Sequence, residues 1–131
     1  MILDTSAVVA ILQGEPEAEA LAGLIESVDR VHISTATVVE ASLVLGGARQ
    51  QVLDDFLASA GAVVVPFDET QVAIARRAHL RYGRGSGSPA RLNYGDCFSY
   101  ALAIASDRPL LFKGSDFTHT DVAVPTPLTP T

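Results

Sequence analysis

The chain begins with the stretch MILDTSAVVAIL (residues 1–12), which decides the expected fold. Its first three residues form a short, wholly apolar run that leads to a carboxylate at Asp4. Thr5 and Ser6 then begin an apolar stretch of helical character that ends at Gly14. An apolar strand followed at once by a helix is typical of a central parallel strand in an α/β sheet. Ligands of such sheets bind beyond the carboxyl ends of the strands, and Asp4 is expected at such an end.

Short apolar runs and helical stretches continue to alternate along the rest of the chain. Helices are predicted at 15–28, 36–45, 49–60, 69–82 and 93–106. Strands are predicted at 31–33, 62–65 and 110–112, with an edge strand at 122–124. This order predicts an α/β domain with a parallel sheet. The 131 residues correspond to one domain with a substantial core, and we expect it to end in a proline-rich tail at 125–131.

The composition excludes a disordered chain and gives a first indication of where the protein works. Hydrophobic residues make up 48% of the sequence. No apolar run approaches the ~20 residues of a membrane span, and no basic region precedes the first apolar stretch, so neither a membrane segment nor a signal peptide is expected. The single cysteine, Cys97, permits no internal disulfide and fits a reducing compartment, so we expect a cytoplasmic protein.

The basic residues are concentrated in one part of the chain, although the formal net charge is -6. No Asp or Glu occurs between Thr70 and Gly95, yet five of the nine basic residues lie there. They are Arg76, Arg77, Arg81, Arg84 and Arg91. A block of one sign favours a polyanionic partner such as RNA, whereas a solvated helix face followed by a glycine-rich loop explains the same pattern without one. Charge alone supports the two interpretations equally.

Four acidic residues indicate that the chemistry lies at the strand ends. Asp4 and Asp116 follow predicted strands, and Asp96 lies in the first turn of a predicted helix. Glu40 lies within an otherwise apolar helix, where no residue three or four positions away can form an ion pair with it. A buried carboxylate without a partner is costly, so Glu40 is expected to be paired or to contact a metal.

Each of the four acidic residues also has a purely structural interpretation. Asn93 and Asp96 have the spacing of a capping box at the start of a helix. Asp116 is suited to a turn or to an ion pair with Lys113. Asp4 can cap the helix that follows it, and Glu40 can be the one exposed residue of its helix. For Asp96 and for Asp116 taken alone, the structural interpretation is the stronger, whereas the functional interpretation is favoured for Glu40.

Taken together, the four carboxylates favour a metal site. The carboxyl ends of parallel strands meet at one edge of a sheet, where uncompensated carboxylates repel one another unless a cation lies between them. Ligands that are all oxygen suit Mg²⁺ or Mn²⁺ rather than zinc. Such ions activate water and stabilise the charge that develops during phosphoryl transfer. The expected reaction class is therefore hydrolysis of a phosphodiester, with the arginine-rich stretch available to the polyanion.

The chain resembles the PIN-domain proteins, and most closely the VapC toxins of bacterial toxin–antitoxin pairs. The resemblance is carried by residues 2–7, 34–36 with Glu40, 92–101, 110–114, 116–117 and 120–122. It implies a three-layer fold in which a central, mostly parallel sheet of about five strands is flanked by helices, formed by residues 1–131 as a single PIN-like domain. It also implies a Mg²⁺-dependent endoribonuclease, usually a homodimer, that is blocked by a cognate antitoxin of the VapB type.

The resemblance also assigns roles to individual residues. Asp4 and Asp96 match the main metal ligands, and Glu40 matches a third acidic member that holds the metal or its water. Asp116 matches the fourth acid, although the segment 113–116 can also be aligned with the acid nearer Lys113. Two polar residues match positions that support the site, Ser6 and Asn93.

The resemblance implies that metal-activated water attacks an RNA phosphodiester, with Glu40 accepting a proton and a 5′-phosphate and 3′-hydroxyl as products. The alternative is a catalytically silent PIN-like module that binds RNA or a protein partner. Metal-dependent cleavage by the purified chain distinguishes the two.

Overall fold

Neighbouring residues of the first strand point to opposite faces of the sheet and thereby belong to two separate cores. Strand β1 (Ile2–Leu3) contributes Ile2 to one buried cluster and Leu3 to the other. Strand β4 (Leu110–Leu111) repeats the pattern, with Leu110 in the cluster of Ile2 and Leu111 in that of Leu3. All four side chains are fully buried. A central strand that is apolar on both sides requires helices on both faces of its sheet.

The computed structural model describes residues 1–125 and shows a sheet of four parallel strands. Strands β2 (His32–Ser34) and β3 (Val63–Val65) complete the order β3-β2-β1-β4. Ile2 pairs with His32 on one side and with Leu110 on the other, so β1 is a central strand as predicted. Because the strands are parallel, their carboxyl ends share one edge of the sheet, and Asp4 follows β1 at this edge.

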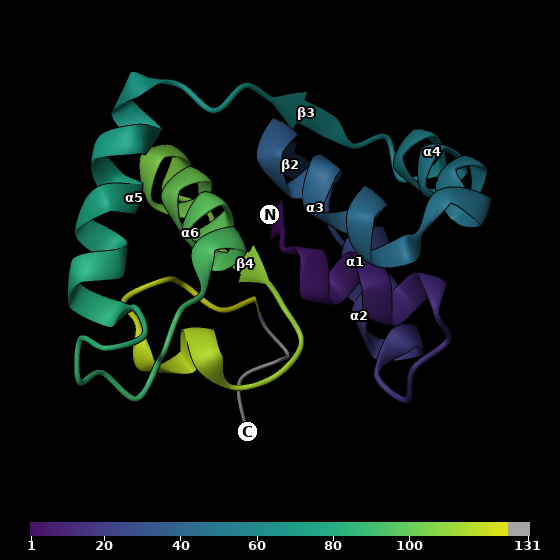
Figure 1. The fold of residues 1–131 in the computed structure, drawn as a ribbon. Helices are drawn as coiled ribbons and strands as arrows, with labels where there is room; N and C mark the ends of the chain where they lie inside the picture. Colours follow the sequence, from purple (N-terminus) through teal and green to yellow (C-terminus); the bar gives the residue numbers. More distant parts are fainter. Residues whose placement is uncertain (126–131) are drawn as a thin grey trace.

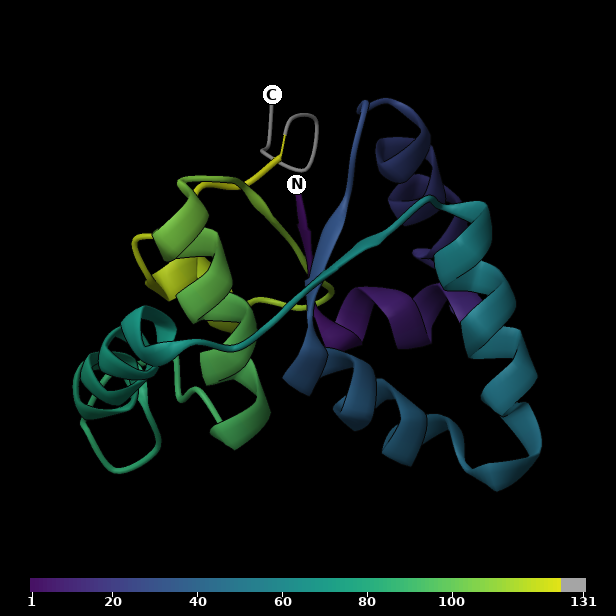
Figure 2. The ribbon, with the colours of Figure 1, turned by 90° about the horizontal axis from the view of Figure 1, so that it is seen from above.

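Two layers of helices enclose the sheet (Figures 1 and 2). The first layer contains α1 (Thr5–Leu12), α2 (Ala18–Glu26), α3 (Thr35–Leu45), the 3₁₀ helix η1 (Gly47–Arg49) and α4 (Gln50–Ser59). The second contains α5 (Glu69–Tyr82), α6 (Tyr94–Ser106) and the 3₁₀ helix η2 (Asp116–His119). Figure 2 shows the two groups on opposite sides of the strands. The predicted α/β fold with flanking helices is therefore confirmed.

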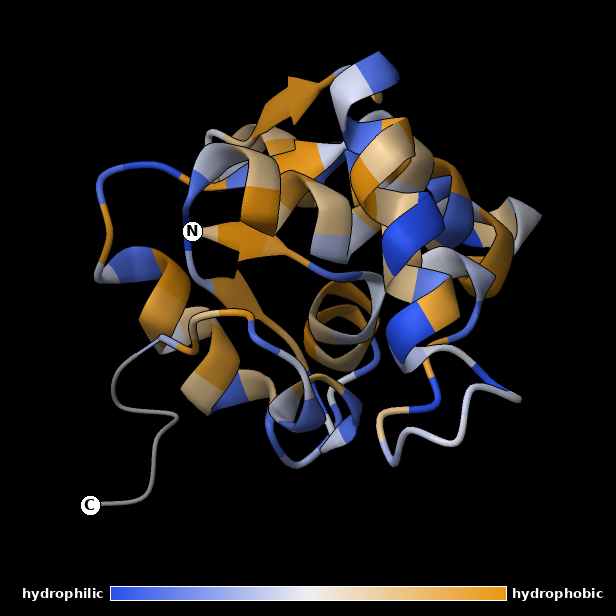
Figure 3. Ribbon diagram, turned by 90° about the vertical axis from the view of Figure 1, so that its left-hand side faces the viewer, coloured by the Kyte–Doolittle hydropathy of each residue, from blue (hydrophilic) through white to orange (hydrophobic). Residues whose placement is uncertain are grey.

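Hydrophobic residues are concentrated at the centre of this arrangement. Figure 3 shows the strands as strongly hydrophobic segments, while polar residues lie on the loops and on outer turns of the helices. Among the described residues, no helix has both the length and the apolar character needed to cross a bilayer. The burial pattern of the strands thus reflects two helix layers packed against one sheet.

The sheet has four strands within the described residues, one fewer than the expected number of about five. Residues 122–124 were expected to form an edge strand, but only one backbone hydrogen bond joins them to a strand, from the N–H of Leu110 to the carbonyl of Ala123 at 3.0 Å. A single bond does not form a ladder. Pro125, which follows, has no N–H with which to extend one. The rest of the predicted proline-rich tail, 126–131, lies outside the described residues.

Helix starts agree with the local sequence signals except at α2. Ser34, Asp68 and Asn93 cap α3, α5 and α6 through their side chains, as expected. Helix α2 begins at Ala18 instead of Glu15, because the residues before it form a turn in which the Ala18 N–H donates to the Glu15 carbonyl at 2.9 Å.

The layered core leads to a test of stability. The substitution Ile33→Ala removes a fully buried side chain from β2 and should lower the free energy of unfolding by about 2–5 kcal/mol. Val64→Ala changes a residue of the edge strand β3 that is 46% exposed, so the loss should be no more than about 1 kcal/mol. Urea unfolding of both variants measures the two losses. Equal losses would contradict this description of the core.

Candidate active site

Asp4 is a buried carboxylate held by hydroxyl groups from both helix layers. It is 2% exposed and caps α1. Its Oδ2 accepts hydrogen bonds from the backbone N–H of Ser6 at 3.0 Å and from the Ser6 hydroxyl at 2.6 Å. Its Oδ1 accepts from the hydroxyl of Ser99 in α6 at 2.6 Å. Burial raises the pKa of Asp4, while these donors act in the opposite direction by stabilising the carboxylate.

The two serines connect Asp4 to further parts of the chain. The Ser6 hydroxyl accepts a hydrogen bond from the backbone N–H of Lys113, just after β4, at 3.0 Å. The Ser99 hydroxyl lies 3.3 Å from the hydroxyl of Thr37 in α3, and both residues are fully buried. The network therefore joins α1, α3, α6 and the end of β4 around one carboxylate.

Glu40 has a partner outside its own helix. The hydroxyl of Thr5 in α1 donates a hydrogen bond to Glu40 Oε1. Its carboxylate lies against Gly95 in the first turn of α6, where an added Cβ atom would overlap the Glu40 carboxylate. Glycine at this position leaves room for the Glu40 side chain, so α3 and α6 meet at the carboxylate.

Asp96 forms the capping box predicted for the start of α6. The Asp96 backbone N–H donates to Asn93 Oδ1 and the Asn93 backbone N–H donates to Asp96 Oδ2, each at 2.9 Å. Burial is the main cause that raises the pKa of Asp96 to about 7, with smaller contributions from the negative charges of Asp4, Asp116 and Glu40. The bond from Asn93 opposes the shift. Asp96 therefore combines a structural role with the electrostatics of an acidic cluster.

A cavity of about 290 Å³ brings most of the predicted site residues together. Its lining includes Asp4, Ser6, Glu40, Asn93, Asp96 and Lys113. Asp116 is an exposed residue of η2 outside this lining, although its charge contributes to the pKa of Asp96. The ammonium group of Lys113 pairs with Glu15 and, at 3.3 Å, with Glu17, so its charge is already compensated by these glutamates.

The chemistry of the cavity fits a hard divalent cation. Its ionisable lining groups, other than lysine, are carboxylates, which suit Mg²⁺ or Mn²⁺. Within residues 1–125, no three Asp, Glu, His or Cys side chains converge closely enough to hold an ion as they stand. Hydrogen bonds account for this separation, since Asp4 is held by Ser6 and Ser99, and Glu40 by Thr5. Burial is the main cause of the raised pKa of Asp96, and a cation would relieve the smaller contribution that comes from repulsion by the other carboxylates.

The five arginines predicted to bind RNA do not line one common surface. Arg76 and Arg84 line a large pocket between α5 and α6. Arg77 and Arg81 line a different pocket, and the Arg81 guanidinium lies 4.9 Å from the centre of the Tyr82 ring. Arg91 is exposed in the loop between these helices and adopts a positive φ of 51°.

Three residues of the site were missed by sequence reasoning. Thr5 and Ser99 bind the carboxylates of Glu40 and Asp4, and Gly95 provides space. Ser99 had a recognisable signal, because it is a polar residue in an apolar helix one turn after an acid. Thr5 and Gly95 had none, since their partners are distant in the sequence.

Comparison with known proteins identifies the family of this fold and site. The model of the PIN domain matches residues 1–123. Ribonuclease VapC28 of Mycobacterium tuberculosis is 48% identical over 126 residues, which cover 93% of this chain and 95% of the relative.

Two solved structures share the fold at low sequence identity. The crystal structure of Mycobacterium tuberculosis VapC20, a Sarcin-Ricin loop cleaving toxin, has a TM-score of 0.75 at 16% identity and covers 96% of this chain and 98% of that one. A toxin–antitoxin complex from Klebsiella pneumoniae has a TM-score of 0.69 at 16% identity and covers 95% of each chain. The family model and the similar ribonuclease together span nearly the whole sequence, and the chain belongs to the PIN-domain family of VapC ribonucleases.

Proposed function

We propose that this chain is a Mg²⁺-dependent endoribonuclease that hydrolyses RNA phosphodiester bonds as the toxin of a toxin–antitoxin pair. The observation that carries the proposal is the cavity at the carboxyl edge of the sheet, lined by Asp4, Glu40 and Asp96. Its similarity to a ribonuclease at 48% identity supports the reaction class. In this proposal, residues 1–131 form one PIN-like domain.

Asp4 and Asp96 are the proposed metal ligands. Both line the cavity, and hydrogen bonds already orient both carboxylates. Mg²⁺, or Mn²⁺ in its place, would supply positive charge and the activation of water when bound. Ser6 supports Asp4 through its hydroxyl, and Asn93 orients Asp96 through the capping box.

Glu40 is the proposed proton acceptor. Its Oε1 is held by the Thr5 hydroxyl, which leaves the second oxygen without an assigned donor among the described contacts. This arrangement keeps the carboxylate at the cavity wall while one oxygen stays available to a proton. Asp116 is the proposed fourth acid, and it acts through its negative charge on Asp96 from outside the cavity lining.

The proposed partners follow from the family and from the surface. A toxin requires an antitoxin, here of the VapB type, and a structure of the same fold is a toxin–antitoxin complex. A homodimer is supported by the outer face of α3, where Val39 is 60% exposed and Leu43 is 77% exposed. An RNA substrate and a single cysteine fit a cytoplasmic location.

Loss of either metal ligand should abolish cleavage. Asp4→Asn and Asp96→Asn keep the shape of the side chain but remove the charge that would hold the cation, so RNA cleavage should disappear in each. Asp54→Asn in the exposed part of α4 makes the same change away from the cavity and should cleave like the parent chain. Gel analysis of total RNA incubated with each chain, with Mg²⁺ or with a chelator, measures the effect.

Circular dichroism is the control for folding in these variants. Cleavage that persists in folded Asp4→Asn or Asp96→Asn would contradict the proposed site. If the parent chain, freed of any co-purified antitoxin, shows no Mg²⁺-dependent cleavage, the catalytically silent binding module becomes the correct function.

The stability of the metal-free protein should depend on the ionisation of Asp96. The pKa of about 7 in the folded protein lies above the ordinary value of 3.8, so the fold favours the protonated carboxyl. This contribution to stability is fully present below pH 3.8 and is lost as the pH rises through 7. Asp96→Asn retains an acceptor for the Asn93 N–H and removes the charge. Its melting temperature should exceed that of the parent by about 3 °C or more at pH 8, but not at pH 4.

Thermal unfolding in the presence of a chelator measures the melting temperatures of the parent chain and of Asp96→Asn at each pH. Mg²⁺ should then stabilise the parent chain more than Asp96→Asn at pH 8, because the variant lacks a ligand. Equal melting temperatures of the two metal-free proteins at pH 8 would contradict the electrostatic description of the cavity.

Gly95→Ala should impair catalysis while leaving the fold intact. The new methyl group would occupy the position of the Glu40 carboxylate, and the flexible end of that side chain would move aside. A displacement of this size should reduce cleavage by about 100-fold. Gly23→Ala is the matched control in α2, where an added Cβ contacts nothing within 4 Å, so cleavage should be unchanged. Initial cleavage rates of a defined RNA compare the variants.

A double variant tests whether Gly95 acts through Glu40. If it does, adding Glu40→Ala to Gly95→Ala should cause little further loss, since the two changes affect one group. If the loss of cleavage rate in the double variant equals the product of the losses in the two single variants, Gly95 does not act through Glu40.

A further inference from the structure

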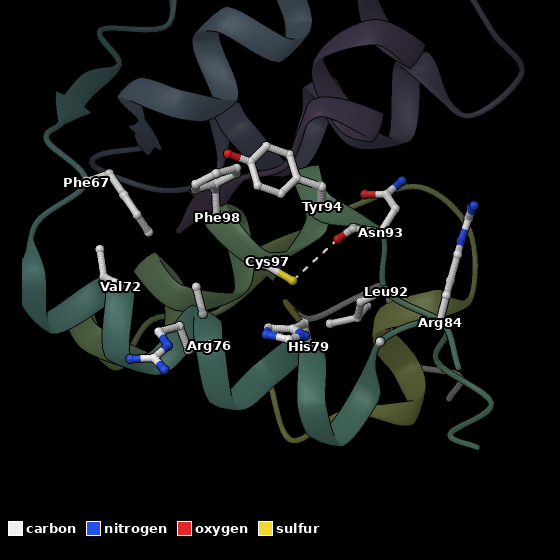
Figure 4. A pocket seen from close by; sticks show the side chains of 12 residues that line it. Phe67, Val72, Arg76, His79, Arg84, Leu92, Asn93, Tyr94, Cys97 and Phe98 are labelled. Carbon is white, nitrogen blue, oxygen red and sulfur yellow. Dashed lines mark hydrogen bonds between the residues drawn. The ribbon is translucent and has the colours of Figure 1, made fainter. Parts of the chain in front are cut away.

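A second and larger cavity adjoins the acidic one. It has a volume of about 600 Å³ and lies between α5 and α6 (Figure 4). Asn93 lines both cavities, so they meet at the first turn of α6. The volume lies within the roughly 300–1,000 Å³ that is usual for ligand pockets. The roles proposed above for the acidic residues do not use this pocket.

One wall of the pocket is aromatic and includes an exposed ring. Tyr94 is 83% exposed and packs edge-to-face on Phe98, with ring centres 4.8 Å apart. Phe98 packs in the same manner on Phe67, also at 4.8 Å. Tyr100, on the same helix, is buried and donates its hydroxyl hydrogen bond to Asp121. Burial in a core therefore explains Tyr100 but does not explain Tyr94.

The ionisable side chains of the pocket favour an anionic ligand. Arg76 and Arg84 lie at its two ends, and His79 lies between them (Figure 4). No Asp or Glu is among its lining residues in the part of the chain that the structure describes. Neither arginine forms an ion pair within residues 1–125. This local excess of positive charge contrasts with a net charge of -6 for the whole chain.

We propose that this pocket binds an unpaired nucleotide of the RNA beside the phosphate that is cut. This inference rests on the proposed ribonuclease function and adds a binding site for the substrate. The base stacks on Tyr94, supported from behind by Phe98, and neighbouring phosphates contact Arg76 and Arg84. Asn93 connects the pocket to the acidic cavity, so one strand of RNA can occupy both.

Binding of a short, fluorescently labelled single-stranded RNA of mixed sequence tests this inference. All variants carry Asp96→Asn so that the RNA is not cut in the presence of Mg²⁺. Tyr94→Ala should weaken binding by about five-fold or more, because stacking on an aromatic ring is lost, whereas Tyr94→Phe should bind like the parent. Fluorescence anisotropy measures each dissociation constant.

Two adjacent arginines provide a matched control for the phosphate contact. Arg76 lines this pocket, whereas Arg77 lines the other pocket formed by α5. Arg76→Ala should weaken binding and reduce the slope of log Kd against log salt concentration by about 0.7, the value for one phosphate contact on a single strand. Arg77→Ala removes the same charge outside this pocket, so it should reduce the slope less than Arg76→Ala does.

Photo-crosslinking locates the RNA independently of these substitutions. RNA that contains 5-iodouridine should crosslink to a peptide that includes Tyr94 or Phe98, as identified by mass spectrometry. Unchanged affinity in both Tyr94→Ala and Arg76→Ala, or an RNA that does not bind the Asp96→Asn chain at all, would overturn the inference. Crosslinks confined to other elements would overturn it too. A further result would also overturn the inference: Tyr94→Ala changes a dimer to a monomer, and the RNA does not crosslink to the pocket. A second copy of the chain would then occupy the pocket.

Failure of this inference is distinguishable from failure of the proposed function. Normal binding by the pocket variants, together with Mg²⁺-dependent RNA cleavage by the parent chain, overturns only the inference. Weakened binding by the pocket variants, together with a parent chain that never cleaves RNA, supports a nucleotide site in this pocket and overturns the proposed catalysis, and with it the placement of that site beside a cut phosphate.

Discussion

The hydrogen bonds of the Asp4 carboxylate are the constraint on which the site depends. Asp4 ends the central strand, caps α1 and accepts from Ser99 of α6, so it joins the two helix layers across the edge of the sheet. A carboxylate that is 2% exposed is costly unless it is well solvated by protein groups. Three donors offset part of that cost without cancelling the charge, and the pKa of Asp4 is still raised. The fold therefore orients this carboxyl group with hydroxyl and backbone donors and gives it no cationic partner among the described residues.

The remaining carboxylates are kept close enough to interact but too far apart to converge. Thr5 holds Glu40 against Gly95, and Asn93 holds Asp96 in a helix cap. These hydrogen bonds fix the position of each carboxylate separately, so the acidic side chains stay apart. Burial is the main cause of the raised pKa of Asp96, and repulsion by Asp4, Asp116 and Glu40 adds to it. If this is the catalytic site, as proposed, the raised pKa of Asp96 means that the site reduces stability at neutral pH, which is a common cost of catalytic sites.

Much of the fold and part of the site follow from local sequence signals. The order of strands and helices, the central position of β1 and the capping box of α6 depend on neighbouring residues, and all were predictable. Contacts between distant residues were not, such as Glu40 against Gly95. The expected basic surface illustrates the same limit. Residues 76 and 77 are adjacent in the chain, but successive helical side chains point about 100° apart, so they line different pockets.

In the proposed function, the two cavities would have separate roles in binding a polyanion. A cluster of carboxylates repels RNA, and a protein of net charge -6 gains no attraction from its overall field. In the proposed function, local positive charge must then provide the affinity for RNA. Arg76 and Arg84 lie in a pocket without acidic lining residues, and Lys113, the cation beside the carboxylates, is paired with glutamates. The arginines line an adjoining pocket and form no ion pairs with the carboxylates of the acidic cavity within the described residues, so both groups keep the charge that their proposed roles require.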